Sequence, residues 1–176
     1  MTEIRIPRQL TSSELTQLAD LLVATVADGA SVGYLPPLPW AKAVAYWQKA
    51  IKPHTVVLLA EVDGRIAGTV QLALESRPNG LHRAEVSKLM VAPAFRRRGI
   101  GRRLMEALEA DARARGRTLL VLDTRASDPS NDLYHVMGYT EAGRIPAYAL
   151  SAAGVLEETV LYYKTIDGKT GRREDG

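Results

Sequence analysis

The sequence predicts an α/β fold in which a mixed central sheet is flanked by helices. The strongest observation is a strand–turn–helix–strand segment over residues 83–123, which is typical of two parallel strands joined by a crossover helix. The second is a set of β-rich runs on both sides of this segment, separated by turn residues. The chain of 176 residues shows no internal repeat and no linker, so we expect a single domain over residues 1–166 and a polar, disordered tail over residues 167–176.

The first half of the chain alternates between helix and strand signals. Ile4 and Ile6 alternate with polar residues and predict an edge strand, and a helix follows to residue 27 with Ser12 or Ser13 as its N-cap. A glycine- and proline-rich loop separates it from a second helix over residues 40–51. Residues 56–62 and 66–74 are apolar runs on either side of an Asp-Gly-Arg turn, and this pattern predicts a hairpin.

The second half contains the crossover segment and the end of the sheet. A strand over residues 83–91 is closed by Pro93, and a helix that is apolar on one face runs from residue 100 to Gly116. Residues 118–123 (TLLVLD) predict a strand buried on both faces and parallel to the earlier one. A loop and a short helix over residues 132–137 follow, and residues 139–150 and 159–165 supply the last two strands.

The turn before the crossover helix is rich in arginine and glycine, since residues 96–101 read RRRGIG. The N-terminus of a helix carries unpaired N–H groups and the positive end of its dipole, and therefore attracts anions. Glycine lets the backbone come close to a ligand, and guanidinium groups are suited to phosphate. Spacing alone leaves two interpretations open, a phosphate site or a solvated basic turn.

The composition argues against several classes of protein. A net charge of +3 is small for a nucleic-acid binder, and the arginines crowded into residues 96–103 favour a local anionic ligand instead. The absence of cysteine excludes disulfides and thiolate chemistry, and the three histidines show no metal-ligand spacing, so no metal is expected. Because neither a membrane-spanning run nor a signal-peptide core is present, we expect a cytoplasmic protein that binds neither membrane nor nucleic acid.

Two motifs in this order resemble those of the GNAT-superfamily N-acetyltransferases. Arg96, Gly99 and Gly101 match the family's acetyl-CoA signature, [Gln/Arg]-x-x-Gly-x-[Gly/Ala] between a strand and a helix, and residues 133–139 (LYHVMGY) match a second family element. The resemblance implies a mixed, mostly antiparallel sheet of six to seven strands flanked by helices on both faces, with a β-bulge in its central strand. It also implies acetyl-CoA as cofactor and transfer of the acetyl group to a primary amine by direct attack in a ternary complex.

Further segments resemble the tabtoxin-resistance acetyltransferase type. They are ASVGY at residues 30–34, the pattern PNGL-RAEV-KLMV over residues 78–91, LDT at 122–124 and YYKT at 162–165. That type acetylates an amine of an amino-acid-like β-lactam toxin. The resemblance therefore implies a small, amino-acid-like acceptor and a role in detoxifying a toxin or an antibiotic.

The transfer requires a group that takes the proton of the amine, and Glu85 and Asp123 are the candidates. A carboxylate in an otherwise apolar strand is unusual, because its burial is costly unless it is paired. The residues alone leave alternatives open: Asp123 caps the following loop, and Glu85 pairs with Lys88 or Arg83. The resemblance implies that both carboxylates are general bases and that Tyr134 is the general acid at the CoA sulfur, whereas core packing is the alternative for Tyr134.

The expected cofactor contacts lie on the central strand, in the arginine–glycine turn and in the segment leading to the tyrosine. They are Leu89, Met90, Val91, Arg96, Arg97, Arg98, Gly99, Ile100, Gly101, Arg102, Ser127, Asn131 and Tyr134. Many family members carry an asparagine seven residues before the tyrosine, where this chain has Ser127, with Asn131 one turn closer. The expected acceptor contacts are Ser31, Tyr34, His82, Glu85 and Asp123.

Three alternative functions remain at the level of the sequence. The first is an acetyltransferase that acts on a protein N-terminus or lysine, and the second is a non-catalytic CoA-binding sensor. The third is a nucleic-acid-binding module built on the arginine cluster, although the interleaved aromatic residues expected for base stacking are missing. The oligomeric state is left open as well, with a homodimer as one alternative.

Overall fold

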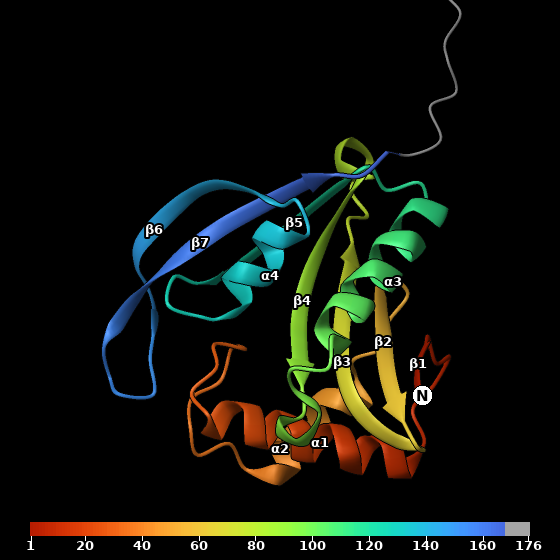
Figure 1. Cartoon of the computed structure of the whole chain (residues 1–176), viewed down its shortest axis with the longest axis vertical. Helices are drawn as coiled ribbons and strands as arrows, with labels where there is room; N and C mark the ends of the chain where they lie inside the picture. Colours follow the sequence, from red (N-terminus) through yellow and green to blue (C-terminus); the bar gives the residue numbers. More distant parts are fainter. Residues whose placement is uncertain (168–176) are drawn as a thin grey trace, which may run out of the picture.

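The computed structural model describes residues 1–167, which form a seven-stranded sheet with helices on both faces (Figure 1). The strand order is β1-β2-β3-β4-β5-β7-β6, and only β4 and β5 are parallel, so the predicted mixed, mostly antiparallel sheet is confirmed. The expected tail at 167–176 lies outside the described residues, apart from its first residue. The elements are β1 (Thr2–Arg5), α1 (Ser12–Ala27), α2 (Trp40–Gln48), β2 (Thr55–Val62), β3 (Arg65–Leu74), η1 (Pro78–Gly80), β4 (Arg83–Val91), η2 (Pro93–Phe95), α3 (Ile100–Ala114), β5 (Leu119–Arg125), α4 (Ser130–Val136), β6 (Thr140–Leu150) and β7 (Leu156–Thr165).

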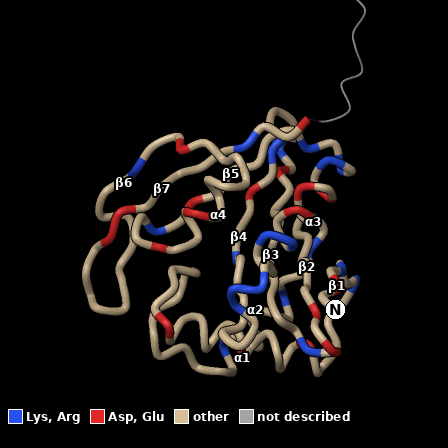
Figure 2. The backbone as a smooth tube through the Cα atoms, in the orientation of Figure 1, with Lys and Arg blue, Asp and Glu red and all other residues tan. Residues whose placement is uncertain are grey.

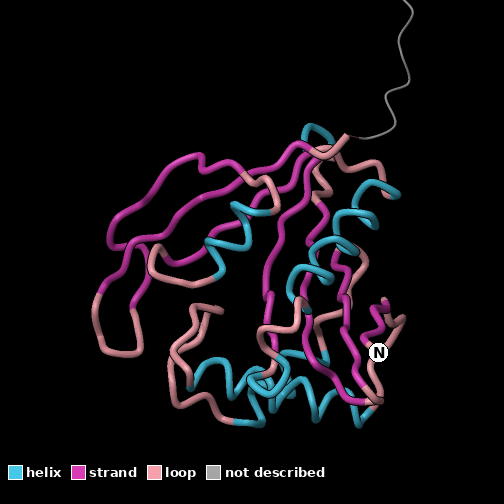
Figure 3. Tube along the Cα trace, in the orientation of Figure 1, coloured by secondary structure: helices cyan, strands magenta, loops and turns pink. Residues whose placement is uncertain are grey.

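The sheet separates two apolar clusters, because successive side chains of a strand point to opposite faces. On β2, Leu58 joins the cluster that contains the apolar side of α3, including Leu104. Its neighbour Leu59 joins the other cluster, with Leu18 of α1 and Trp47 of α2. Figures 1 and 3 show the resulting layers, with α3 lying across β2 and β3 and with α1 and α2 packed together. The central strands are therefore covered by helices on both faces.

The parallel pair β4–β5 is hydrogen-bonded only at its beginning. Arg83, Ala84 and Glu85 pair with residues 119–121 of β5, and the two strands then run apart (Figure 1). On its other side β4 pairs with β3, and the register shifts there because two residues of β4 oppose one of β3. Lys88 lies in this β-bulge with a left-handed φ of 55°. The bulge implied by the family resemblance is therefore present, and it lies where β4 separates from β5.

Several helix and strand ends differ from the sequence-based expectation. The N-cap of α1 is Thr11, because Glu14 lies three residues later and completes a capping box in which each side chain binds the other's backbone N–H. The predictions of Ser12 and Ser13 as the cap are wrong. Helix α2 ends at Gln48, three residues before the predicted end, and β7 begins three residues early at Leu156. None of these shifts moves a candidate site residue to another element.

Candidate active site

A cavity of about 640 Å³ opens where β4 and β5 run apart, beside the N-terminus of α3. Its lining residues come from the end of β4, from the arginine–glycine turn, from the segment after β5 and from the end of α1. They are Thr25, Asp28, Ala30, Leu89, Met90, Val91, Phe95, Arg96, Arg97, Gly99, Ile100, Gly101, Arg102, Arg125, Asp128, Pro129, Ser130, Asp132 and Leu133. The cavity has the volume of a site for a large organic ligand.

The N-terminus of α3 faces this cavity without a cap. Gly99 is the N-cap residue, with a left-handed φ of 73° and no side chain to bind the helix amides. The first backbone bond of the helix runs from the Arg103 N–H to the Gly99 carbonyl at 3.1 Å. Within residues 1–167, the N–H groups of Ile100, Gly101 and Arg102 therefore find no backbone acceptor. Three unpaired amides at the positive end of a 15-residue helix form an anion site.

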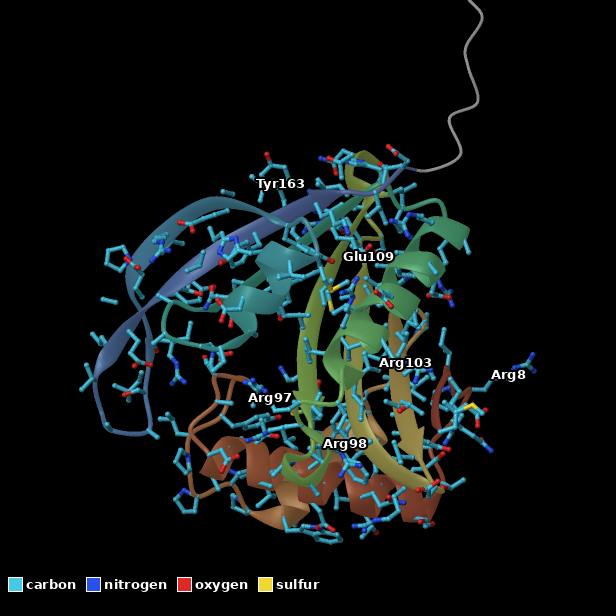
Figure 4. The ribbon with its side chains drawn as sticks, in the orientation of Figure 1. Arg8, Arg97, Arg98, Arg103, Glu109 and Tyr163 are labelled. Carbon is cyan, nitrogen blue, oxygen red and sulfur yellow. The ribbon has the colours of Figure 1, made fainter. Side chains whose placement is uncertain are left out.

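Arginines follow one another along the turn that leads to α3 (Figure 2), but their side chains have different surroundings. Arg96 donates to Asp28 Oδ2 at 2.8 Å and to the Val91 carbonyl at 3.2 Å, so its guanidinium joins the turn to α1 and β4. Arg98 lies over the Phe95 ring, 5.4 Å from its centroid, and does not line the cavity. Its expected cofactor contact is therefore not supported, because the turn directs it to another side than Arg97 (Figure 4).

Arg97 and Arg102 line the cavity, and only one of them is paired with a neighbouring side chain. Arg102 donates to Glu106 at 2.8 Å, one helical turn further along α3. Arg97 is exposed, adopts a left-handed φ of 62°, and makes no hydrogen bond or ion pair within residues 1–167. Arg97 is therefore the guanidinium of this turn that is available for an anionic ligand, and Arg102 is available once it leaves Glu106.

A second, smaller cavity of about 250 Å³ lies between the loop after α1 and the tip of the β6–β7 hairpin. Its lining includes three of the five expected acceptor contacts, which are Ser31, Tyr34 and Asp123. The hairpin side is formed by residues 148–152, and Glu157, Glu158 and Thr159 of β7 complete the wall. Ala30 and Arg125 line both cavities, so the two spaces meet at these residues.

The two candidate bases lie on the same face of the sheet. Asp123 lines the smaller cavity and accepts a hydrogen bond from the Thr159 hydroxyl at 3.1 Å. Glu85 is exposed on β4 and lines neither cavity. The alternative partner of Glu85, Arg83, instead pairs with Glu75 at 3.0 Å. Both carboxylates act electrostatically on the ammonium of Lys88.

Tyr134 lies on α4 at the edge of the larger cavity. Only 6% of the residue is exposed, and its ring packs against the rings of Tyr139 and Tyr162 with centroids 5.7 Å apart. Burial raises the pKa of Tyr134 to about 12, so the phenol keeps its proton at neutral pH. Its neighbours Ser130 and Leu133 line the cavity, although Tyr134 itself does not. The ring belongs to the core, as the alternative interpretation of Tyr134 expects, and α4 places this residue next to the lining of the cavity.

Besides Arg98, Glu85 and Tyr134, three more expected contacts line neither cavity. His82 precedes β4 at the end where β4 and β5 are paired, and its carbonyl accepts the Thr118 N–H at 2.8 Å, so the acceptor contact predicted for it is not supported. The Asn131 amide is occupied, since it donates to the carbonyls of residues 125, 126 and 128 and accepts from the Tyr162 hydroxyl at 2.7 Å. Ser127 is exposed. The cofactor contacts predicted for Ser127 and Asn131 are therefore not supported, and Asp128 and Ser130 line the cavity in their place.

Sequence reasoning missed the residues that join the two cavities. Arg125 lies two residues after Asp123 on β5, donates to the Gly29 carbonyl at 2.8 Å and to Glu157 at 3.1 Å, and so ties the loop after α1 to β7. Its position at the carboxyl end of a buried strand was the available signal. Tyr148 of the hairpin tip lines only the smaller cavity, and it gave no signal because the loop after α1, which lines the same cavity, is distant from it in the sequence.

No group of three or more histidine, aspartate and glutamate side chains in residues 1–167 is arranged to hold a metal ion. The same part of the chain has no helix with the length and hydrophobicity needed to cross a membrane. A diverging parallel strand pair beside an uncapped, arginine-rich helix N-terminus defines a site for a long ligand that carries phosphate groups.

Comparison with known proteins identifies the family. The model of the acetyltransferase (GNAT) family matches residues 21–139. An uncharacterized N-acetyltransferase of Azospirillum brasilense is 33% identical over 130 residues, which cover 71% of this chain and 77% of the relative. The aminoglycoside N(6')-acetyltransferase type 1 of Klebsiella aerogenes is 28% identical over 104 residues, covering 57% of this chain and 68% of that protein.

A solved structure has the same fold. The crystal structure of an aminoglycoside 6'-N-acetyltransferase complexed with coenzyme A superimposes with a TM-score of 0.76 and 19% identity, covering 94% of this chain and 97% of that one. The chain belongs to the GNAT family of acetyltransferases, enzymes that use acetyl-CoA as the acetyl donor.

Proposed function

We propose that this protein transfers the acetyl group of acetyl-CoA to the primary amine of a small molecule. The observation that carries the proposal is the uncapped N-terminus of α3, whose three free amides open into the cavity between β4 and β5. An anion bound there would satisfy these donors, and the diphosphate of CoA is such an anion. The structure of similar fold that is complexed with coenzyme A supports the choice of cofactor.

The residues present fit acetyl-CoA. The amides of Ile100, Gly101 and Arg102 and the guanidinium of Arg97 would hold the diphosphate. The edge of β4 over residues 89–91 has left its pairing with β5 and would present main-chain groups to the pantetheine arm. Bound in this way, the thioester supplies an activated acyl group, whose carbonyl oxygen becomes an anion during attack and is stabilised by N–H donors of β4.

The acceptor amine must lose a proton, since a primary ammonium titrates at about 10 in water. Asp123 borders the smaller cavity, and Glu85 lies on the same face, so either carboxylate takes that proton directly or through a water. The new bond forms between the amine nitrogen and the acyl carbon, and the bond from that carbon to sulfur breaks. Holding the two substrates in line at the junction of the cavities provides much of the rate.

Tyr134 acts on the departing thiolate as a hydrogen-bond donor. Its pKa of about 12 lies above the value of about 8.5 that is typical of a thiol, so complete proton transfer from the phenol is unfavourable. A hydrogen bond to the developing thiolate stabilises it without requiring that transfer. The role assigned here to Tyr134 is therefore weaker than that of a full general acid.

The size of the smaller cavity favours a small acceptor over a protein substrate. Its volume of about 250 Å³ suits a molecule of amino-acid size. The resemblance to the tabtoxin-resistance type, and the aminoglycoside acetyltransferase relative, also support a small-molecule amine and a detoxifying role. A homodimer stays a prediction, for which the exposed edge strand β6 would be the natural interface.

An amine-library screen with acetyl-CoA, read by release of free thiol, tests the proposal. The library should contain amino acids, amino-acid-like β-lactams, aminoglycosides and peptides with free N-termini, and acetyl-CoA binding should be measured in parallel by calorimetry. Thiol release with a small amine supports the proposal, and preference for peptides would support the protein acetyltransferase. Acetyl-CoA binding without turnover on any amine would support the CoA sensor.

A further inference from the structure

Lys88 stands out on the acceptor side of β4 because its backbone is unusual. It lies in the β-bulge with φ at 55°, a left-handed conformation that lysine rarely adopts. The bulge lies where β4 separates from β5, and the next residue, Leu89, already lines the cofactor cavity. The lysine side chain therefore leaves the strand at the point where the two substrates would meet.

The ammonium of Lys88 is held in place but not neutralised. Its Nζ lies 5.6 Å from the centroid of the Tyr46 ring, and the Tyr46 hydroxyl in turn donates to Gln71 at 2.8 Å. Within residues 1–167, no carboxylate is in ion-pair contact with Lys88 and no acceptor is hydrogen-bonded to it. Arg125, in contrast, already has Gly29 and Glu157 as partners.

The Lys88 ammonium lies beside Gly33, a lining residue of the smaller cavity, although Lys88 itself is not part of that lining. A Cβ atom placed on Gly33, which lines that cavity, would lie 3.8 Å from Lys88 Nζ. The glycine therefore leaves the space beside the ammonium open. Asp123 lines the same cavity and, together with Glu85, acts electrostatically on Lys88 without contacting it. One cation and two carboxylates thus lie near each other, with none of them paired to another.

We propose that Lys88 selects the acceptor by binding its carboxylate, while the acceptor's amine lies toward Asp123 and Glu85. This arrangement of charges is complementary to an α-amino acid, which carries one carboxylate and one amine a few bonds apart. A partly buried ammonium without a partner gains a charge-assisted hydrogen bond from such a ligand. The inference rests on the proposed function, since it names the group that the same site recognises.

The test uses matched pairs of acceptors, namely each proteinogenic L-amino acid and its α-carboxamide. The two members of a pair have the same amine and side chain and differ in the charge at the carboxyl group. For the amino acid that is acetylated fastest, wild-type kcat/KM should exceed that of its amide about tenfold or more, the range of a hydrogen bond to a charged group. Lys88→Met should lower kcat/KM for the acid to the level of the amide and leave the amide unchanged.

Two further variants serve as controls. Lys42→Met removes an exposed lysine of α2 and should change neither substrate, while Lys88→Arg keeps the charge and should retain part of the preference for the acid. If Lys88→Met does not fold, Lys88→Gln provides the same comparison with a polar side chain. Thermal unfolding of each variant shows whether it is folded.

The outcomes separate this inference from the proposed function. Equal kcat/KM for acid and amide in the wild type, or an equal loss for both in Lys88→Met, would overturn the role of Lys88. Thiol release with other amines but with none of the amino acids would also overturn it, although the acetyltransferase activity would stand. Failure to release thiol with any amine would contradict the proposed function itself.

Discussion

Substitutions at Gly99 and Gly101 should separate the stability of the arginine–glycine turn from its ability to bind acetyl-CoA. Gly99 has φ at 73°, and an added Cβ would meet no atom within 4 Å, so the cost of Gly99→Ala comes from the backbone alone. A left-handed conformation costs an L-residue roughly 1–2 kcal/mol. In a chain of this size, about 1 kcal/mol corresponds to roughly 2–4 °C in Tm, so Gly99→Ala should lower Tm by about 2–8 °C.

Gly101 behaves differently, because it lies in the first turn of α3 without a positive φ. A Cβ there would lie 3.5 Å from Leu133 Cδ2 and 3.8 Å from Val91 Cγ2, which are ordinary contacts. Gly101→Ala should therefore stabilise the chain by about 0.4–1 kcal/mol through the unfolded state, and should still bind acetyl-CoA. The family signature also admits alanine at this position.

Gly101→Val places two further methyl groups in the wall of the cofactor cavity, next to the free amides. Because a hydrogen bond between an N–H and a charged phosphate contributes about 1.5–3 kcal/mol, loss of one such contact should weaken acetyl-CoA binding by roughly 10- to 150-fold. Calorimetric titration with acetyl-CoA measures the affinity, and thermal unfolding measures Tm. Gly101→Ala is the matched control for Gly101→Val.

The reasoning would be refuted by normal affinity in Gly101→Val, since the diphosphate would then bind away from the α3 amides. A Tm for Gly99→Ala equal to the wild-type value would show that the turn relaxes and that its left-handed geometry is not required. Loss of binding in Gly101→Ala as well would mean that contact with the glycine itself, rather than room for the phosphates, determines the affinity.

Four other predictions concern individual side chains. Arg97→Ala should weaken acetyl-CoA binding about tenfold and make that binding less dependent on salt, because Arg97 is exposed and unpaired in the turn. Calorimetry at two salt concentrations measures both effects, and an unchanged affinity would show that Arg97 does not contact the cofactor. Tyr134→Phe should lower kcat about tenfold or more with little change in acetyl-CoA affinity, because the substitution removes the hydrogen-bond donor to the thiolate. Unaltered single-turnover rates would exclude this role of the Tyr134 hydroxyl. Asp123→Asn should flatten the acidic limb of the pH–rate profile more than Glu85→Gln, because only Asp123 borders the acceptor cavity; an unchanged profile in both would point to another base. Burial lowers the pKa of Lys88, and the charges of the two carboxylates oppose this effect only in part. The buried ammonium therefore destabilises the folded chain at neutral pH, and this penalty disappears as the pH rises through the lowered pKa toward the ordinary value of 10.5. Lys88→Met should raise Tm at neutral pH by more than at about pH 10, and equal gains at both pH values would contradict the burial argument.

Most of the fold could be predicted because its signals are local. The apolar periodicity of α3 and the buried run TLLVLD identify the crossover unit, and the Asp-Gly turn identifies the β2–β3 hairpin. The exact N-cap of α1 was missed because three candidate residues, Thr11 to Ser13, are adjacent. Only the reciprocal bonds between Thr11 and Glu14 decide between them.

The candidate site was harder to predict, because proximity in sequence does not give the direction of a side chain. Asn131 lies beside the site, yet its amide is fully used by the loop that it stabilises. His82 precedes the same strand as Glu85, but it lies at the closed end of the β4–β5 pair. Lys88 gave no signal, since neither a bulge nor a left-handed lysine can be inferred from apolar periodicity.

The arginine cluster shows why charge alone is a poor guide to a phosphate site. Arg96, Arg98 and Arg102 are each engaged by a neighbour, namely Asp28, the Phe95 ring and Glu106. Arg103 lies outside the cavity lining and donates to the Thr2 carbonyl at 2.8 Å. The donors left for a diphosphate are mainly uncharged amides, whose dipoles are fixed by α3 and are weakly screened when the ligand covers them. Acetyl-CoA binding should therefore depend far less on salt than a cluster of five arginines suggests, and a steep salt dependence would show that these side chains leave their present partners when the cofactor binds.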